Sequence, residues 1–339
     1  MSEKSSSFSF LVLTYNHEAF IIQHLESIKY LTISFGDNID IDLIISDDHS
    51  VDKTKSLIEA WLVHNSNLFR HVTVLFSTKN IGTCASLNNM LDHMRSLRCK
   101  ITAGDDLYSF QNIFELTECD SEVSMVSGRV LHLVNDVLYI DKLSNILETA
   151  TQVIYDKTSL LHRFKHLSYN NAPNMLYSTE CLMHPQTRNF LSQFDVVEDW
   201  PIQVAIARQY PKKRFKLVDA IFVYYRRTGG STYIVANQRF INDKIKLFYN
   251  FLDNEISLIE KIRISSRKFC FIRQNLWINR YVNIDFYFFA VSCIFRFWDI
   301  ISRHNMLKLE LLQHQQHFAY IKAAASLFEV NFILSQKKL

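Results

Sequence analysis

Residues 8–16 read FSFLVLTYN, an apolar run that stops at a polar Thr-Tyr-Asn turn, and the run predicts a short buried strand. Residues 41–48, IDLIISDD, and residues 100–106, KITAGDD, follow the same pattern, each ending in a pair of aspartates. Parallel α/β sheets bind their ligands beyond the carboxyl ends of the strands. These polar and acidic strand ends therefore predict a ligand site at one edge of a sheet.

The segments between these strands carry helical patterns. Residues 17–30 and 51–63 have apolar residues at helical spacing, and a further helix is expected after Gly82. Residues 72–76 predict another strand. Strands that alternate with helices at this interval indicate a mostly parallel, Rossmann-like α/β sheet with helices on both faces.

The second half of the chain is less regular. Residues 123–140 predict two strands joined by a turn at Asn135-Asp136. Two or three helices are expected to follow to about residue 210, and then a strand over 220–225. Beyond it the pattern is typical of helices rich in Phe, Tyr, Ile and basic residues. We therefore expect an α/β domain over 1–235 and a basic, aromatic helical extension over 236–339.

The composition narrows the class of protein. The chain has 339 residues, of which 48% are hydrophobic and 21% charged, and this excludes a disordered protein. The net charge of +3 is too small to indicate nucleic-acid binding, and we expect none. Residues 241–339 hold 14 Lys or Arg and 8 Asp or Glu, a net charge of +6, which leaves −3 for the first 240 residues.

The compartment is predicted from three features. The six cysteines are scattered without a Cys-x-x-Cys pair, which indicates reduced thiols in the cytosol. The first seven residues are polar, unlike a signal peptide. The longest apolar stretch, residues 286–295, is half the length of about 20 residues that a spanning helix needs. We expect a cytoplasmic protein without a membrane-spanning segment.

Asp105 and Asp106 are adjacent at a predicted strand end. Two carboxylates about 5 Å apart repel by roughly 3 kcal/mol at an effective dielectric constant of about 20, and a divalent cation removes this repulsion. One carboxylate can then hold Mg²⁺ or Mn²⁺ against a diphosphate while the other meets a ribose hydroxyl. The alternative is a helix N-cap with a solvated acid beside it.

Asp47 and Asp48 form a second acidic pair. A helix cap needs one acid, and a second carboxylate can accept the N3–H of a uracil. Tyr15 offers a ring to stack on that base and Asn16 an amide to orient it, although Tyr15 is equally explained by core packing. No G-x-G-x-x-G or P-loop motif is present, so the common nucleotide-binding loops are excluded.

The segment Glu198-Asp199-Trp200 precedes Pro201 and a predicted helix. Acids ahead of a first-turn proline are good capping chemistry. The functional interpretation makes Asp199 a general base held at the edge of the site by a rigid helix.

Taken together, the motifs resemble those of the family-2 inverting glycosyltransferases with the GT-A fold, of the bacterial O-antigen and capsule type. The resemblance covers residues 8 to about 232, and six segments match in the family's order: Leu13–Asn16, Ile45–Ser50, Lys79–Gly82, Ala103–Asp106, Glu198–Asp199 and Tyr225–Ser231. It makes residues 1–235 a GT-A domain that binds a nucleotide sugar and catalyses its transfer.

The resemblance implies a role for each matching residue. Asp199 would be the catalytic base and Asp106 the ligand of a Mn²⁺ or Mg²⁺ ion that bridges the two phosphates. Tyr15 and Asp48 would contact uracil, Asp105 the ribose, and the Arg226–Ser231 loop would close over the diphosphate. The full set expected to bind the UDP-sugar donor is Thr14, Tyr15, Asn16, Asp47, Asp48, Asn80, Gly82, Asp105, Arg226, Arg227 and Ser231.

Two positions depart from the family pattern: Thr228 stands where members often have His, and Ser86–Asn89 where many have an Arg. Arg226 or Arg227 is expected to supply the missing positive charge. The reaction implied is a single displacement with inversion, in which Asp199 removes a proton from an acceptor hydroxyl.

The acceptor is predicted from fewer residues. Glu198, Trp200, Asn171 and His184 are expected to line its pocket, although a structural role explains His184 better. The extension interleaves Arg and Lys with Phe, Trp and Tyr, so it can lie on an anionic membrane or pack as a helical subdomain. By analogy with the family, we expect a lipid-diphosphate-linked saccharide acceptor and a peripheral position on the inner face of the bacterial cytoplasmic membrane.

Two alternatives remain at this stage. One is an inactive family member that binds nucleotide or scaffolds an assembly complex, which the departures at Thr228 and Leu87 favour. The other is a nucleotidyltransferase that makes nucleotide sugars, which would normally open with a glycine-rich, basic loop where Thr14–Glu18 stand.

Overall fold

A computed structural model describes residues 6–118, 121–167, 172–227, 238–307 and 310–336 of the chain. The predicted site residues Asn171 and Ser231, together with Thr228, lie outside the described residues.

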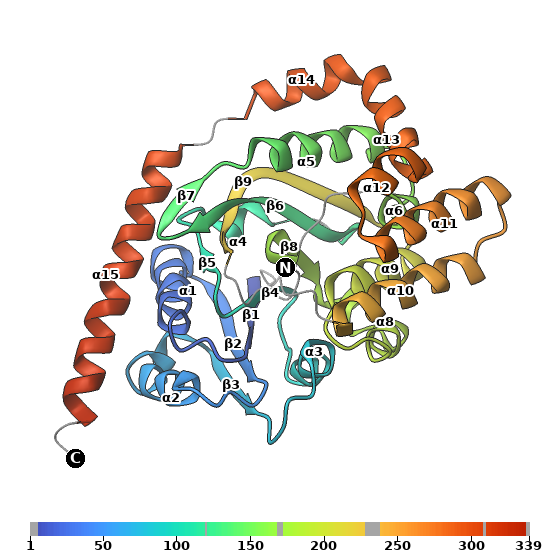
Figure 1. Cartoon of the computed structure of the whole chain (residues 1–339). Coiled ribbons are helices and arrows are strands. Elements are labelled where there is room, and N and C mark those ends of the chain that lie inside the picture. Colours follow the sequence, from blue (N-terminus) through green and yellow to red (C-terminus); the bar gives the residue numbers. More distant parts are fainter. Residues whose placement is uncertain (1–5, 119–120, 168–171, 228–237, 308–309, 337–339) are drawn as a thin grey trace, which may run out of the picture.

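The first half of the chain forms the parallel part of one sheet (Figure 1). Its four parallel strands are β1 (Ser6–Thr14), β2 (Ile39–Asp47), β3 (His71–Phe76) and β4 (Arg98–Ala103). Their order is β3-β2-β1-β4, so β1 lies between β2 and β4. The predicted parallel α/β core is confirmed, with each of these strands found where the apolar runs indicated.

Side chains of β1 explain why helices cover both faces of the sheet. Phe8, Phe10 and Val12 point to one face, where they pack with α1 (Ile21–Phe35) and α2 (Thr54–Asn65). Leu11 and Leu13 point to the other face, toward α3 (Thr83–Leu91) and α9 (Asp199–Gln209). Because successive side chains of a strand alternate between faces, a fully apolar strand has to be buried on both sides.

The second half extends the sheet with strands of mixed direction. They are β5 (Leu107–Tyr108), β6 (Val123–Val134), β7 (Val137–Tyr139), β8 (Met175–Ser178) and β9 (Arg214–Arg226). β8 lies antiparallel between β4 and β6, and β6 runs parallel to β9. The predicted turn is confirmed, since Asn135 and Asp136 have φ of 48° and 63°, a conformation in which Asn and Asp are common.

Two expectations for this half need correction. β8 was not predicted, because four residues are too short for a periodic signal. β9 begins at Arg214 rather than at residue 220, because its first half pairs with β6 while leaving polar side chains partly exposed. At the irregular β6–β9 pairing, Gly128 leaves room for the Phe222 ring, and a Cβ there would lie 2.3 Å from that ring.

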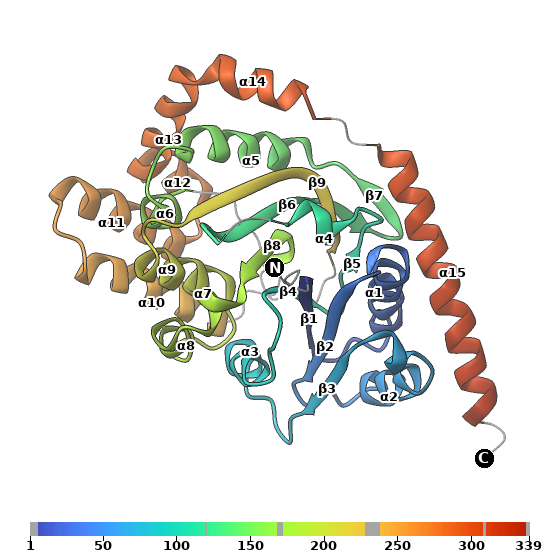
Figure 2. The same ribbon diagram turned by 180° about the vertical axis from the view of Figure 1, so that it is seen from behind.

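Helices fill the rest of the chain (Figures 1 and 2). Those before β9 are α4 (Ile113–Leu116), α5 (Lys142–Tyr155), α6 (Leu160–Lys165), α7 (Thr179–Met183), α8 (Pro185–Leu191) and α9. Those after it are α10 (Gln238–Asp253), α11 (Leu258–Arg273), α12 (Leu276–Val282), α13 (Ile284–Phe295), α14 (Phe297–Asn305) and α15 (Leu311–Gln336). More helices therefore lie between residues 140 and 210 than the two or three expected.

The C-terminal helices are not all remote from the sheet. α10 packs against α11, whereas α15 returns across the molecule and packs against α1 and β7. The hydroxyl of Tyr224 in β9 lies 3.0 Å from Nδ1 of His314 in α15. No helix in the described part of the chain combines the length and apolarity needed to cross a membrane. A separate extension over 236–339 remains a prediction.

Candidate active site at the carboxyl edge of the sheet

The ends of β1, β2 and β4 meet at one edge of the sheet. Thr14 is in register with Asp47, and Leu13 with Ala103. Backbone hydrogen bonds continue past the strands, from Asp48 N–H to the Thr14 carbonyl (2.9 Å) and from Gly104 N–H to the Leu13 carbonyl (2.8 Å). The residues that follow these strands are thereby gathered at one edge.

Asp48 closes a turn instead of standing free. Its two carboxylate oxygens accept the backbone N–H groups of Ile81 (2.7 Å) and Gly82 (2.9 Å). Gly82 has φ of 89°, and a Cβ at this position would lie 2.3 Å from the Asp195 carboxylate. Only glycine fits such a turn comfortably. The Asp48 carboxylate is therefore held by the turn, and its predicted contact with a uracil stays a prediction.

Asp47 and Asn16 stabilise the neighbouring loop. Asp47 accepts the N–H of Ser50 at 2.9 Å, and the Asn16 side-chain oxygen accepts the N–H of Val51 at 2.9 Å. Asn16 has φ of 54°, in the left-handed region that asparagine tolerates. Thr14 is buried beneath this loop, whereas Tyr15 is 46% exposed. Of the residues at this strand end, Tyr15 is therefore the one whose side chain a base can reach.

The two aspartates after β4 lie in different environments. Asp106 is only 2% exposed and accepts the backbone N–H of Arg226 at 2.9 Å. Burial, and then the charge of Asp105, raise the pKa of the Asp106 carboxyl well above its usual value. Asp105 is partly exposed. Asp105 is therefore the more accessible of the two carboxylates in this structure, and the predicted division of roles between Asp105 and Asp106 stays a prediction.

The side chain of Arg226 is buried and hydrogen-bonded within the protein. Its Nε donates to the Asp105 carbonyl at 2.8 Å, another guanidinium nitrogen donates to Gln23 at 2.7 Å, and the side chain is 6% exposed. Arg227 lies 3.7 Å from the Asp141 carboxylate. Arg226 is thus held within the protein, whereas the Arg227 side chain is 33% exposed. The expected contact of these arginines with a diphosphate stays a prediction.

The segment that leads to Asp199 is held by a residue that sequence reasoning missed. One carboxylate oxygen of Asp243, in α10, accepts the backbone N–H groups of Asp195 (2.9 Å), Val196 (2.7 Å) and Val197 (3.0 Å). Asp243 is 6% exposed. Hydrogen bonds to a buried charged group are among the stronger ones in proteins. Asp243 therefore fixes the backbone immediately before Glu198 and Asp199.

The same segment is joined to the strand edge. The carbonyl of Asp195 accepts the N–H of Cys84 at the start of α3 (3.0 Å), and its carboxylate pairs with Arg239 of α10. Arg239 also donates to the side chain of Asn80 at 3.3 Å. A chain of contacts thus runs from Asp48 through the Asn80–Gly82 turn to Asp195. Arg239 and Asp243 lie beyond residue 235, where no motif marked them.

Glu198 and Asp199 begin helix α9, with Pro201 in its first turn. Burial, with a further contribution from the charge of Asp199, raises the pKa of Glu198 to about 8. Burial thus favours the neutral form of Glu198, the acid next to Asp199.

Two predicted acceptor residues have structural roles. Trp200 donates its indole N–H to the Phe164 carbonyl at 2.7 Å and packs against Phe248 and Phe251. The Nδ1 of His184 accepts the N–H of Gln186 at 3.3 Å and caps α8. The structural alternative for His184 is the one observed.

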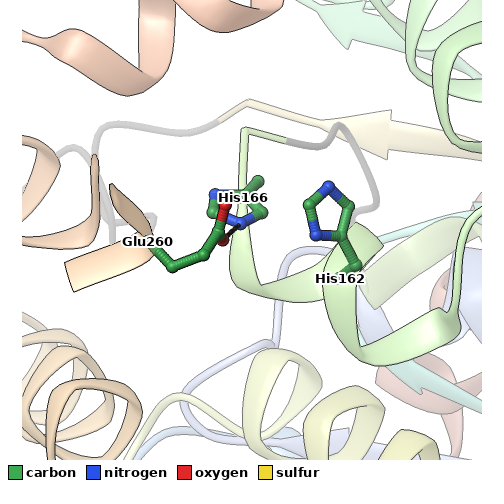
Figure 3. Close-up of side chains that lie close together, drawn as sticks. All are labelled: His162, His166 and Glu260. Atoms are coloured by element: carbon green, nitrogen blue, oxygen red, sulfur yellow. Dashed lines mark hydrogen bonds and ion pairs between the residues drawn. The ribbon is translucent and has the colours of Figure 1, made fainter. Parts of the chain in front are cut away.

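A second polar cluster joins α6 to α11 (Figure 3). Ligand-type atoms of His162, His166 and Glu260 lie within 4.8 Å of one another. His166 bonds Glu260 with one ring nitrogen and Asp285 with the other (2.9 Å). Although burial alone would raise it, the hydrogen bond with His166 and the charge of Arg267 lower the pKa of Asp285 to about 2.

This cluster is complete without a cation. Arg263 donates to both Glu260 (2.9 Å) and Asp285 (2.8 Å), so the carboxylates already face positive charge. Its members come from α6, α11 and α13, and none follows a strand of the parallel sheet. We interpret it as an ionic tie between helices.

Known proteins resemble this chain in both sequence and fold. Residues 9–118, which include β1 to β4 and Asp105, match the model of glycosyl transferase family 2. The chain carries a family-2 glycosyltransferase domain. Over 167 residues the glycosyltransferase is 27% identical to the minor teichoic acid biosynthesis protein GgaA of Bacillus subtilis strain 168. That match covers 48% of this chain and 35% of GgaA, so the chain spans about a third of this relative.

Solved structures identify the fold as GT-A. S. aureus TarS 1-349 in complex with UDP-GlcNAc superposes with a TM-score of 0.55 at 16% identity, covering 94% of this chain and 89% of TarS 1-349. The mannosyltransferase PcManGT from Pyrobaculum calidifontis, in complex with GDP-Man and Mn²⁺, gives a TM-score of 0.53 at 16% identity, covering 94% and 86%. The predicted family and fold are confirmed.

The hydrogen bonds of Asp243 predict a positioning role. Asp243→Asn removes the charge that three backbone N–H groups share, so the segment before Asp199 should loosen. A small misplacement at a reacting centre costs up to about 100-fold in rate. We expect kcat to fall by tenfold to about 100-fold, with little change in UDP affinity. Steady-state kinetics and calorimetric UDP titration measure the two quantities.

Asp253→Asn is the matched control, because Asp253 is an exposed acid at the other end of the same helix. It should leave kcat unchanged. Equal kcat in Asp243→Asn and wild type would contradict the positioning role, provided that both proteins have the same melting temperature.

Proposed function

We propose that this protein is a divalent-cation-dependent, inverting glycosyltransferase that uses a UDP-sugar. The sugar moved is a hexose or N-acetylhexosamine, and the acceptor is a hydroxyl of a lipid-diphosphate-linked saccharide in bacterial surface polysaccharide assembly. The observation that carries the proposal is the chain of contacts from Asp48 through the Asn80–Gly82 turn to Asp195. It joins the strand edge, where a donor would bind, to the segment that bears Asp199.

The donor site is assigned from exposure and neighbours. Tyr15 is exposed beside the end of β1, so its ring can stack on a base. TarS 1-349, the neighbour of the same fold, has been solved with UDP-GlcNAc. These two facts favour a uridine donor. The loops stabilised by Asp47, Asp48 and Asn16 would shape the pocket from behind, with few direct contacts to the ligand.

For the cation, we propose Asp105 as the ligand. Its carboxylate is the exposed member of the pair, and oxygen ligands suit Mn²⁺ and Mg²⁺. PcManGT, another neighbour of this fold, was solved with Mn²⁺. A divalent cation held there would neutralise the charge that develops on the departing diphosphate. Asp106 would support the site indirectly, by holding the backbone of Arg226 in place.

The chemical step is assigned to Asp199. As a base it would take the proton from an acceptor hydroxyl, whose oxygen attacks C1 of the sugar while the bond from C1 to the UDP oxygen breaks. One displacement inverts the anomeric centre, so an α-linked donor yields a β-glycoside.

The class of acceptor and the location of the enzyme are proposed from the match with GgaA and from the motifs. GgaA is a teichoic acid biosynthesis protein, and this supports a surface polymer as the product class. Teichoic acid assembly is therefore as good a setting as the O-antigen or capsule assembly expected from the motifs. A lipid-diphosphate acceptor would place the enzyme on the inner face of the cytoplasmic membrane.

Replacing the base tests the mechanism. Positioned base catalysis contributes roughly 10²- to 10⁴-fold, so Asp199→Asn should lower kcat by about that factor. UDP affinity should persist, because Asp199 does not belong to the strand edge. The anomeric configuration of the wild-type product, read by proton NMR, should be β. Unchanged turnover in Asp199→Asn, or an α-linked product, would contradict this assignment.

Replacing each acid after β4 tests the cation site. Asp105→Asn removes a charged oxygen ligand, so the Mn²⁺ concentration that gives half-maximal activity should rise at least tenfold. Asp106→Asn should instead lower the melting temperature, because Asp106 is buried against Arg226. Activity titrated with Mn²⁺ and Mn²⁺ binding followed by electron paramagnetic resonance measure the first effect. A higher Mn²⁺ requirement in Asp106→Asn, with a wild-type requirement in Asp105→Asn, would indicate that Asp106 is the ligand.

A further inference from the structure

Helices α12 to α14 leave an unusual number of apolar side chains in solvent. Every residue from 272 to 298 is described, and 14 large apolar side chains in this stretch are exposed. The most exposed aromatic ones are Phe295 (83%), Trp298 (79%) and Trp277 (69%). The others are Ile272, Leu276, Tyr281, Val282, Ile284, Phe286, Tyr287, Phe288, Val291, Ile294 and Phe297. We call these 14 side chains the 272–298 surface.

Helices α13 and α14 also have a buried face, so their exposed side chains are not a sign of loose packing. Phe289 of α13 and Ile300 of α14 are 4% and 5% exposed, and they pack with Val153 and Tyr155 of α5. α13 is also tied down through Asp285, which bonds His166. The helices are therefore fixed on one side and present a second apolar side outward. Monomeric soluble proteins rarely expose large contiguous apolar surface without a partner.

The charges of this stretch have one sign. Arg273, Arg280 and Arg296 are exposed, whereas Asp285, the acid between residues 272 and 298, is 1% exposed. Arg296 pairs with Asp299 just beyond the stretch, whereas Arg273 and Arg280 form no ion pair with an acid in the described part of the chain. Both lie near aromatic rings, those of Phe269 and Tyr281.

The position of these helices suits contact with a large flat partner. Figures 1 and 2 show α14 at the margin of the molecule beyond α5, α13 next to it, and α12 between α13 and α11, all of them away from α2 and β3. A partner there would not cover the carboxyl ends of β1, β2 and β4. The site can therefore stay open while the helices are occupied.

We propose that the 272–298 surface is a docking site for an anionic phospholipid bilayer, with α12 to α14 lying in the plane of its interface. Exposed Trp, Tyr and Phe interleaved with arginines are the chemistry of helices that lie on a membrane, and the exposed acid of α14, Asp299, is already paired with Arg296. Arginine supplies attraction to anionic headgroups. A second copy of this chain packed against the surface would cover the apolar side chains equally well. In a symmetric dimer, however, the arginines of one copy would face those of the other and repel them. The proposal deepens the proposed function, because it brings the enzyme to a lipid-linked acceptor.

Vesicle flotation tests the docking site without any sugar donor, so its result is independent of the proposed reaction. The wild-type chain should float with vesicles of phosphatidylcholine and phosphatidylglycerol, and less with phosphatidylcholine alone or at high salt. Trp277→Ser/Phe295→Ser/Trp298→Ser should lose binding at least tenfold. Arg273→Gln/Arg280→Gln should lose roughly 30-fold, at about fivefold for each arginine near an anionic surface.

The matched control removes apolar side chains elsewhere. The variant Ile33→Ser/Val51→Ser/Val63→Ser changes residues in α1, in the loop before α2 and in α2, which are 58%, 80% and 76% exposed in that order. This variant should float like wild type. All variants change exposed side chains, so circular dichroism and melting temperature should match those of the wild type.

Tryptophan fluorescence gives a second measurement with an internal control. The four tryptophans include Trp61, which is buried in the core, and Trp200, which is partly buried. Brominated lipid should quench the emission of Trp277 and Trp298 and spare the other two, so Trp277→Phe/Trp298→Phe should abolish quenching. Wild-type binding by the triple serine variant, absence of vesicle binding, or self-association that the triple variant removes without any lipid binding would overturn the proposal.

Discussion

The arrangement of the site depends on one carboxylate, that of Asp48. A buried strand brings it to the edge of the sheet, where it accepts two backbone N–H groups of the Asn80–Gly82 turn. That turn has to pass close to the Asp195 carboxylate, and the absence of a side chain at Gly82 makes this possible. Asp195 in turn lies four residues before Asp199. The sheet edge and the predicted base are therefore parts of one hydrogen-bonded unit.

The two acids after β4, Asp105 and Asp106, lie in different environments. The two adjacent carboxylates lie in the turn between β4 and β5, and one of them points back into the protein. Asp106 is the buried one, and its hydrogen bond with the backbone of Arg226 ties β9 to the end of β4. Asp105 is left toward solvent. One acid thus holds the fold while the other is available to a cation.

The parts of this structure that could be predicted from sequence are those with periodic or repeated signals. The runs 8–14 and 41–45 are apolar because they are buried on both faces, and their ends had to meet because parallel neighbours share an edge. β8 could not be found, since a strand of four residues contains no period. Asp243 and Arg239 could not be found either, because isolated polar residues in an amphipathic helix look like its solvated face.

Burial separates the predicted site residues into two groups. A motif indicates which residues gather at a site, but burial decides which of their side chains reach a ligand. Asp48, Asp106 and Arg226 are all at the predicted edge, and each is occupied by backbone groups of a neighbouring segment. Only the packed structure shows that Tyr15, Asn16 and Asn80 are exposed and that Asp105 is partly exposed.

The most direct test of the account is UDP release from a panel of UDP-hexoses and UDP-N-acetylhexosamines, with a lipid-diphosphate-linked saccharide as acceptor and with either Mn²⁺ or EDTA. The account predicts turnover of one donor in Mn²⁺, its loss in EDTA, and binding of UDP by the protein. Failure of UDP to bind with or without Mn²⁺ would contradict the assignment of the strand edge as a nucleotide-sugar site.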